Sequence, residues 1–184
     1  EFRRVLFRSA ELNLTYLIAS KWSMGYSDKI MITISNPYRW LVPTLSLAMA
    51  LIYLDWKAGV SALVLGSLSA SVADAINSRL LKKKTDRVRP GKQFEDIRSL
   101  GVMNHGKKSF PSNHASNTMA FAISFSFMFS WTAWLLIPLS LLVGYSRIYC
   151  GAHFPLDVIA GWLFGATWSL IFYNIISLLW TFQY

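Results

Sequence analysis

The sequence is poor in charged residues and in cysteine. Charged side chains make up 15% of its 184 residues, whereas soluble domains typically carry about 25%. Apolar residues make up 54%, and there are eight tryptophans. This composition argues against an ordinary soluble domain and favours a membrane protein, and the length fits one domain. The single cysteine, Cys150, excludes an intrachain disulfide. There is no internal repeat and no low-complexity tract.

Apolar runs recur along the chain, and a membrane-spanning helix needs about 20 such residues. Residues 11–37 carry Lys21, Asp28 and Lys29, too many charges for an easy crossing, so we expect one or two helices there that lie in the membrane interface. A sixth, irregular crossing is the alternative. Pro138 is expected in the first turn of its helix. We expect membrane-spanning helices over residues 40–56, 58–81, 115–134, 135–149 and 156–180.

The predicted fold is therefore all-α: an integral membrane helical bundle with five or six transmembrane helices plus interfacial N-terminal helices. Residues 1–9, EFRRVLFRS, lack an initiator methionine and begin with the Glu-Phe pair that a common cloning site encodes. We interpret them as a vector-derived segment, with a short basic anchor as the alternative. Residues 10–184 are then expected to form a single domain.

Basic residues gather in one segment where acidic residues are scarce. The chain has a formal net charge of +9, and residues 82–108 contain nine basic and three acidic side chains, a net +6. Such a block indicates an anionic partner, which could be phosphate, a lipid headgroup or nucleic acid. A solvated basic loop is the alternative. The basic residues are Lys82, Lys83, Lys84, Arg87, Arg89, Lys92, Arg98, Lys107 and Lys108.

The order of the apolar runs predicts that three polar segments meet at one membrane face. The second run ends at residue 81 and delivers the basic segment to a face, from which the third run departs. The fourth run returns to that face and the fifth leaves it again. Segments 82–90, 111–114 and 146–157 should therefore lie together, although they are far apart in the sequence.

Each of these segments carries residues suited to binding or transferring phosphate. In KKKTDRVRP, Lys82 and Arg89 are cations, and the proline that follows Arg89 favours an extended backbone there. In PSNH, Ser112 is a helix-capping residue, and the free N–H groups of a helix start can hold a phosphate. His114 can exchange a proton near neutral pH. Taken alone, each motif could be a membrane-flanking cation or a helix cap.

The third segment, SRIYCGAHFPLD, adds a nucleophile to these groups. Arg147 can bind a phosphate through two parallel hydrogen bonds, which lysine cannot do. His153 and Asp157 are four residues apart, and an aspartate can hold an imidazole in one tautomer so that its other nitrogen can attack. Asp74, inside the small-residue run 66–75, is either a partner for a nearby cation or a hydrogen-bonded structural group, and we favour the second interpretation.

The three motifs in this order, Lys-x6-Arg-Pro, Pro-Ser-x-His and Ser-Arg-x5-His-x3-Asp, resemble the type 2 phosphatidic acid phosphatase family. One departure is Asn113, where the family usually has glycine. The resemblance implies that His153 attacks phosphorus, that Asp157 orients His153, and that His114 protonates the leaving oxygen and then activates water. It implies that the phosphoryl oxygens are held by Lys82, Arg89, Ser112, Arg147 and the backbone N–H groups at Asn113 and His114.

The same resemblance sets the expected cofactors, partners and location. No cofactor or metal is expected, because the three histidines are scattered and acidic residues are few. The expected partners are a lipid phosphate or pyrophosphate and the surrounding membrane lipids, without nucleic acid and without a required oligomer. The positive-inside tendency would place the basic face in the cytoplasm. The resemblance instead implies the bacterial inner membrane with the site facing the periplasm, and we follow it. His105 and Cys150 are expected to be a loop residue and a packing residue.

The expected activity is hydrolysis of a lipid phosphomonoester or pyrophosphate through a phosphohistidine. The sequence does not choose among undecaprenyl pyrophosphate, phosphatidylglycerol phosphate and phosphatidate. A lipid A 1-phosphatase of the same family and a phospholipid headgroup or phosphoryl transferase are alternatives. A protein that only binds a headgroup would not need two histidines and an aspartate. A haloperoxidase, which shares this site architecture, is disfavoured by the membrane spans.

Overall fold

The computed structural model describes residues 2–22, 25–101 and 108–181. The described chain is a helical bundle of the membrane type, and its only β pairing is an isolated bridge between Val88 and Lys108. The helices are α1 (Phe2–Tyr16), η1 (Leu17–Lys21), α2 (Gly25–Ser35), η2 (Pro37–Trp40), α3 (Leu41–Leu54), α4 (Trp56–Ile76), η3 (Asn77–Leu81), α5 (Lys82–Thr85), α6 (Pro90–Gln93), α7 (Asn113–Met128), η4 (Ser130–Thr132), α8 (Ala133–Tyr149) and α9 (Pro155–Thr181).

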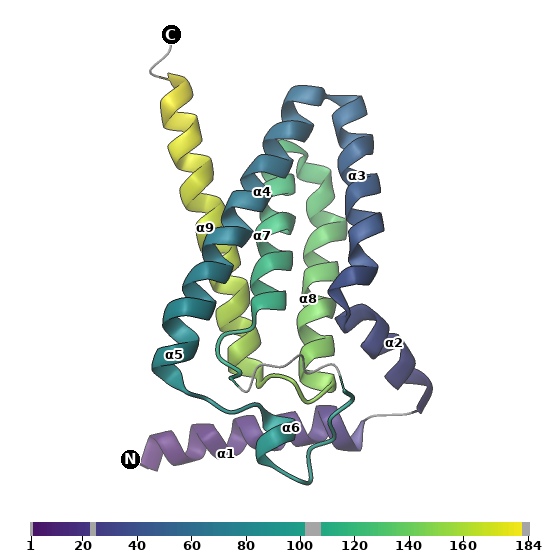
Figure 1. Cartoon of the computed structure of the whole chain (residues 1–184), viewed down its shortest axis with the longest axis vertical. Helices are drawn as coiled ribbons and strands as arrows, with labels where there is room; N and C mark the ends of the chain where they lie inside the picture. Colours follow the sequence, from purple (N-terminus) through teal and green to yellow (C-terminus); the bar gives the residue numbers. More distant parts are fainter. Residues whose placement is uncertain (1, 23–24, 102–107, 182–184) are drawn as a thin grey trace.

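Helix α7 forms the centre of the bundle, with α4, α8 and α9 packed around it (Figure 1). Small residues let the helices approach closely. A Cβ on Gly165 would lie 2.1 Å from the carbonyl oxygen of Ser116, so α9 touches the backbone of α7 there. Gly66 and Ala70 of α4 are also buried, and the side chain of Phe121 on α7 covers Gly66. The small-residue run 66–75 therefore makes the close helix contact that its composition predicts.

The helix boundaries differ from the expected ones at the turn between α7 and α8. Helix α7 ends at Met128, and η4 leads directly into α8, which begins at Ala133. Pro138 is therefore the sixth residue of α8 and lies in its second turn, so the prediction that it lies in the first turn is wrong. The reason is local: the 3₁₀ turn at residues 130–132 starts the helix ahead of the expected position.

Three helical stretches of the described chain are long and apolar enough to cross a membrane: Trp56–Thr85, Ser130–Tyr149 and Pro155–Leu178. Helices α3 and α7 have 14 and 16 residues, fewer than the about 20 that a spanning helix needs. The expected number of five or six transmembrane helices therefore stays a prediction, whereas the all-α membrane bundle is confirmed.

The N-terminal helices cover the end of the bundle at which α8 and α9 are joined. Helix α1 lies across this end and α2 packs beside α8 (Figure 1). Asp28 on α2 forms an ion pair with Arg98 and accepts a hydrogen bond of 2.9 Å from the Tyr149 hydroxyl. Residues 11–22 and 25–35 thus form a helical layer against the bundle, as expected of interfacial helices. Helix α1 extends back to Phe2, through the segment that we interpret as vector-derived.

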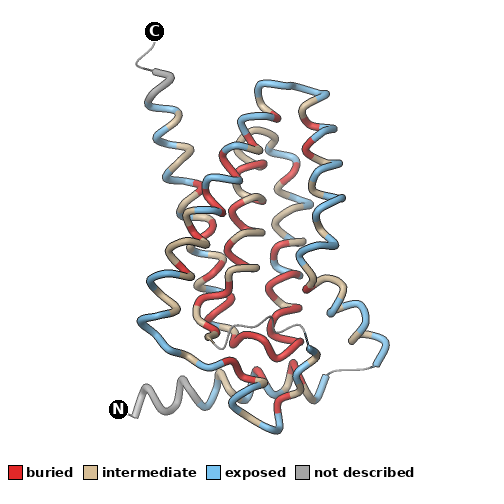
Figure 2. The backbone as a smooth tube through the Cα atoms, viewed as in Figure 1, coloured by how far each residue is buried: buried red, intermediate tan, exposed pale blue. Residues whose placement is uncertain are grey.

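The most deeply buried part of the chain is a connection rather than a helix centre. Every residue from Ser146 to Phe154 is buried, including Arg147 and His153. Figure 2 shows this stretch as a continuous buried segment at the covered end of the bundle. Burying a cation and an imidazole is unfavourable unless each has partners, so this end of the molecule is where a functional site is to be sought.

Candidate active site

The buried connection between α8 and α9 is tied to the basic segment through backbone contacts. Gly151 has φ +68°, and a Cβ there would lie 2.1 Å from the carbonyl oxygen of Arg98. Its own carbonyl accepts a 2.9 Å hydrogen bond from the N–H of Gly91. A glycine is required here by both the conformation and the close approach. The contact fixes the segment after Arg89 against the segment before His153.

His153 and Asp157 form the pair that their spacing predicts. Both side chains are buried, and Nδ1 of His153 lies 3.7 Å from Oδ2 of Asp157. The same Oδ2 accepts a 2.9 Å hydrogen bond from the N–H of Phe154, at the start of α9. Because Nδ1 faces the carboxylate, Nε2 is the nitrogen left for chemistry. The 3.7 Å separation is longer than a hydrogen bond, as is common before substrate draws a catalytic pair together.

Burial sets the protonation of His153. Removal from water lowers the pKa of the His153 imidazole to about 4, and the charges of Arg147 and Arg89 act in the same direction. Asp157 opposes this shift and favours the imidazolium. The imidazole is therefore neutral near pH 7, which is the form that can attack an electrophile. Burial also raises the pKa of the Cys150 thiol to about 11, so Cys150 is protonated and packs in the core, as predicted.

Three cations predicted to bind phosphate converge beside this pair. Arg89 and Arg147 are 7% and 2% exposed, and each lies within electrostatic range of Lys82. Arg147 donates hydrogen bonds from Nη1 to the carbonyl and hydroxyl oxygens of Ser35. Arg89 donates from Nε to the carbonyl oxygen of Lys108 at 3.3 Å, and burial lowers the pKa of its guanidinium. Two buried arginines and a half-buried lysine that repel one another suit a multiply charged anion.

Two buried nitrogens in this cluster mark where that anion would bind. Nη1 of Arg89 and Nε2 of His114 are both buried and have no hydrogen-bond partner among the described residues. Buried donors are normally satisfied. His114 is within electrostatic range of Arg147, His153 and Arg89, so the two nitrogens belong to one site. An anion with several oxygens would supply the missing acceptors.

The PSNH motif sits at the start of α7 as the sequence predicts. The hydroxyl of Ser112 caps the helix by accepting from the N–H of Ala115 at 3.5 Å, and the N–H of Ser112 donates to the carbonyl oxygen of Asp157 at 2.9 Å. This second bond joins α7 to α9 at the catalytic pair. The start of α7 therefore lies at the site, and the free N–H groups of a helix start can hold an anion.

Asn113 is held by three side chains. Its Oδ1 accepts a 2.8 Å hydrogen bond from Nζ of Lys82, while its Nδ2 donates to Asp74 Oδ1 at 2.5 Å and to Ser78 Oγ at 2.8 Å. Asp74 is thus hydrogen-bonded, as the structural interpretation holds, and it is also linked to a cation through Asn113. The side chain of Asn113 positions Lys82, a role that glycine could not fill.

Sequence reasoning missed the role of two residues, Arg87 and Glu11. The sequence places Arg87 only among the basic residues 82–108, which are expected to face an anionic partner or water. In the structure its Nη1 donates to Asp157 Oδ1 at 2.7 Å, its Nη2 pairs with Glu11 Oε2 at 2.5 Å, and its guanidinium lies 4.1 Å from the centre of the Phe154 ring. Glu11 also accepts from the N–H of Leu156 at 3.1 Å. Acidic residues are scarce in the segment around Arg87, which indicates that a partner would come from elsewhere in the chain. The sequence does not identify that partner, because Glu11 lies in a different segment.

The structure brings together all eight predicted site residues from the three segments. His105 lies outside the described residues. Within the part of the chain that the structure describes, no group of three histidine, cysteine or acidic side chains is arranged to hold a metal ion. The site instead offers an imidazole nucleophile oriented by a carboxylate, a second histidine, a helix start and three cations, which is the equipment for phosphoryl transfer.

The fold and the buried cation cluster define a class of helical membrane protein with a candidate phosphate site, and comparison with known proteins names its superfamily. The family model of the PAP2 superfamily matches residues 58–180, and the chain belongs to this superfamily. It is 30% identical over 156 residues to the lipid A 1-phosphatase of Rhizobium etli, covering 83% of this chain and 64% of that protein. It is 44% identical over 64 residues to the undecaprenyl-diphosphatase of Sulfolobus acidocaldarius, covering 34% of this chain and 31% of that protein.

A solved structure shares the architecture. The crystal structure of Aquifex aeolicus LpxE superimposes with a TM-score of 0.61 at 27% identity, covering 87% of this chain and 92% of that chain. The present chain spans less than two thirds of the length of each sequence relative named above. These similarities establish the superfamily and the fold.

Proposed function

We propose that this protein is a metal-independent lipid phosphatase of the PAP2 superfamily that works through a phosphohistidine. One observation carries the proposal: a buried, neutral His153 faces Asp157 beside Arg89, whose Nη1 is a buried donor without an acceptor in the described chain. An imidazole nucleophile beside a buried guanidinium N–H that has no acceptor suits a phosphate. The family's site residues match this chain at every position except Asn113.

The first step would transfer the phosphoryl group to the protein. Nε2 of His153 attacks phosphorus, a bond forms between nitrogen and phosphorus, and the bond from phosphorus to the lipid oxygen breaks. Burial and the neighbouring cations lower the pKa of His114; the bound phosphate anion offsets them and favours the imidazolium, which donates its proton to that leaving oxygen. Asp157 stabilises the positive charge that develops on the imidazole of His153. The phosphoryl oxygens would be held by Lys82, Arg89, Arg147, Ser112 and the helix start at Asn113.

The second step would release phosphate. His114, now neutral, takes a proton from water as the water oxygen attacks phosphorus. The bond from phosphorus to Nε2 of His153 breaks and inorganic phosphate leaves. His114 ends the cycle protonated, so one histidine serves first as general acid and then as general base. The three cations offset the charge of the transferring group without a metal.

The substrates we propose are lipid phosphates and pyrophosphates of a bacterial inner membrane, with the site facing the periplasm. The lipid A 1-phosphatase of Rhizobium etli and the undecaprenyl-diphosphatase of Sulfolobus acidocaldarius support the lipid phosphate class. The apolar helices keep the lipid chains in the bilayer, while the cation cluster lies at the covered end of the bundle. A single chain supplies every proposed site residue, so no oligomer is required.

Phosphate release by the purified protein in detergent, with EDTA present, tests the proposal. The panel contains lipid A, undecaprenyl pyrophosphate, phosphatidate and phosphatidylglycerol phosphate. His153→Ala is expected to abolish release, and brief denaturation of the protein after mixing with ³²P-labelled substrate should trap an acid-labile phosphoprotein that His153→Ala cannot form. Release that needs added Mg²⁺, or that survives His153→Ala, would overturn the mechanism.

A further inference from the structure

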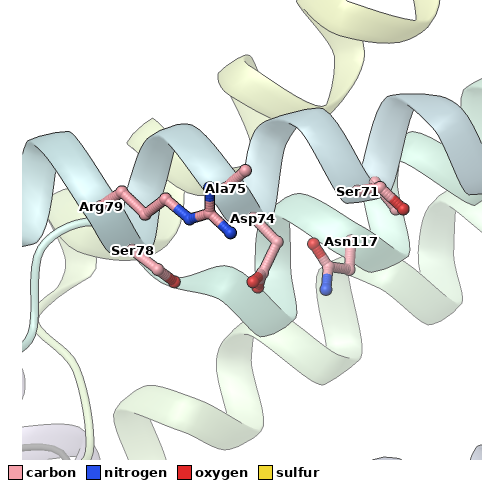
Figure 3. Close-up of a pocket in the computed structure, with 7 residues that line it drawn as sticks. Ser71, Asp74, Ala75, Ser78, Arg79 and Asn117 are labelled. Carbon is pink, nitrogen blue, oxygen red and sulfur yellow. The ribbon is translucent and has the colours of Figure 1, made fainter.

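A polar groove opens on the side of the bundle between α4 and α7. Its volume is about 440 Å³. Figure 3 shows Asp74 on α4 and Asn117 on α7 with their side chains in the space between the two helices. The groove is lined by Ala70, Ser71, Asp74, Ala75, Ser78, Arg79 and Asn117. None of these residues except Asp74 and Ser78 contacts the active-site residues through a hydrogen bond that the described structure records.

The groove contains one buried acceptor without a partner in the described chain, on α7, and one carboxylate on the apolar helix α4. Oδ1 of Asn117 is buried and has no hydrogen-bond partner among the described residues. Asp74 lies in Trp56–Thr85, the first of the three stretches suited to crossing a membrane. Polar groups in such a place normally face a partner or a pathway. Helix packing does not explain them, because packing is provided by the neighbouring small residues Gly66, Ser69 and Ala70.

The groove is joined to the phosphate site by one residue. Asn113 receives a hydrogen bond from Lys82 on one side and donates to Asp74 and Ser78 on the other. Asn113 also lies between Ser112 and His114 in the sequence. A lipid whose phosphate occupied the cation cluster would therefore place the atoms next to its phosphate beside Asn113 and the mouth of the groove.

We propose that this groove binds the unit of the lipid that carries the scissile phosphate, and that it selects units with hydroxyl and carbonyl oxygens. A phosphorylated sugar offers hydroxyl groups and carbonyl oxygens, and a phosphorylated, acylated glycerol offers ester carbonyl oxygens, to which Asn117 Nδ2 can also donate. The inference rests on the proposed phosphatase function and adds the substrate class. The Asp74 carboxylate and Asn117 Oδ1 can accept from hydroxyl groups, whereas Arg79 and Ser71 can donate to carbonyl oxygens.

A polyprenyl phosphate is disfavoured by the same groups. Its phosphate is attached directly to a hydrocarbon chain, which would displace water from Asp74 and Asn117 without replacing the hydrogen bonds. Sites built to hydrogen-bond a substrate discriminate strongly against an analogue that lacks the polar group. A glycolipid or glycerolipid phosphate would satisfy the groove while its acyl chains remained in the bilayer.

The test compares each variant with wild type on three lipids: lipid A as the sugar case, phosphatidate as the glycerol case and undecaprenyl phosphate, the monophosphate, as the hydrocarbon case. Asn117→Leu and Ser71→Ala remove polar groups of the groove that do not contact Asn113. Asn174→Leu on α9 and Ser67→Ala on α4 make the same changes at exposed positions and serve as matched controls. Size-exclusion chromatography verifies that each variant is folded.

Asn117→Leu is expected to lower kcat/KM for lipid A, for phosphatidate or for both at least tenfold more than for undecaprenyl phosphate, and Ser71→Ala should act in the same direction. The lipid with the larger loss identifies the sugar or glycerol source. Neither control variant should change the ratio of kcat/KM between the three lipids. Equal losses on all three lipids, or no loss on any, would overturn the selectivity of the groove.

Binding separates this inference from the proposed catalysis. The inactive His153→Ala protein is mixed with the same lipids, and bound lipid is counted by native mass spectrometry. Asn117→Leu in this background should weaken binding of lipid A or phosphatidate about tenfold relative to undecaprenyl phosphate. An unchanged preference would overturn the groove assignment even where phosphate release is normal. A changed preference, where the wild-type protein releases no phosphate from any of these lipids, would support the groove and reject the phosphatase.

Discussion

Arg87 donates a 2.7 Å hydrogen bond from Nη1 to Oδ1 of Asp157, the carboxylate that faces His153. The other end of the same guanidinium pairs with Glu11 on α1. The orientation of Asp157 is therefore set from two sides, by the N–H of Phe154 at Oδ2 and by Arg87 at Oδ1. Helix α1, which lies outside the bundle, is thus linked to the pair of His153 and Asp157 through Arg87.

Replacing Arg87 with lysine should lower kcat by about tenfold or more with little change in KM. Lysine keeps the charge but cannot bridge two carboxylates in the fork geometry of a guanidinium. Arg87 touches Asp157 and not the phosphate cluster, so its loss should affect chemistry more than binding. Steady-state kinetics measure the split, and Arg39→Lys, an exposed arginine, is the matched control. A raised KM with normal kcat would mean that Arg87 holds substrate instead.

The pH dependence of kcat/KM should have its acid limb near pH 4. Burial lowers the pKa of His153 to about 4, and only the neutral imidazole attacks. Activity is therefore retained as pH falls through 6.5, the ordinary histidine value, and is lost as pH falls through about 4. The pKa of the substrate phosphate is measured by ³¹P NMR in the same micelles, and kcat/KM is corrected for the ionised fraction of the substrate at each pH. Because Asp157 favours the imidazolium, the residual activity of Asp157→Asn should have its limb at lower pH. A wild-type limb near 6.5 would contradict the assignment.

Asn113→Gly should destabilise the protein even though glycine is usual in the family pattern. The change removes three hydrogen bonds and leaves Lys82 and Asp74 without their shared partner. Loss of the partner of a partly buried polar group costs about 1–3 kcal/mol. The midpoint of unfolding in detergent is the measurement, with Asn174→Gly at an exposed helical position as the control for glycine in a helix. Equal midpoints for the two variants would show that the Asn113 network contributes no stability.

Gly165→Ala should separate α7 from α9 and lower both stability and activity. The added Cβ would lie 2.1 Å from the carbonyl oxygen of Ser116 and 2.9 Å from the N of Ala120, so the backbones must move apart. Overpacking of this kind typically costs about 1–3 kcal/mol. Gly25→Ala, where a Cβ meets nothing within 4 Å, is the control. A Gly165→Ala protein with the unfolding midpoint of Gly25→Ala would contradict the packing described.

The local parts of the site were predictable because their signals lie within short stretches. The spacing of His153 and Asp157 places them at one helix start, and Ser112 caps α7 where the motif predicts. The convergence of the three segments followed from counting crossings, since each apolar run reverses the side of the membrane. The turn before α8 was predicted less well, because the boundary between two adjacent apolar runs has no strong polar mark, and Pro138 was placed one turn too early.

The sequence by itself determined that this protein is a helical membrane bundle in which three separate motifs meet at one end. Hydropathy, helix-capping residues and residue spacing can be read from short stretches of sequence, because they do not depend on which distant segments pack together. Tertiary structure alone decided that Arg87 pairs with Glu11, 76 residues away, and that Asn113 joins Lys82 to the groove at Asp74. These contacts depend on which helix faces meet, and packing between distant segments sets those faces.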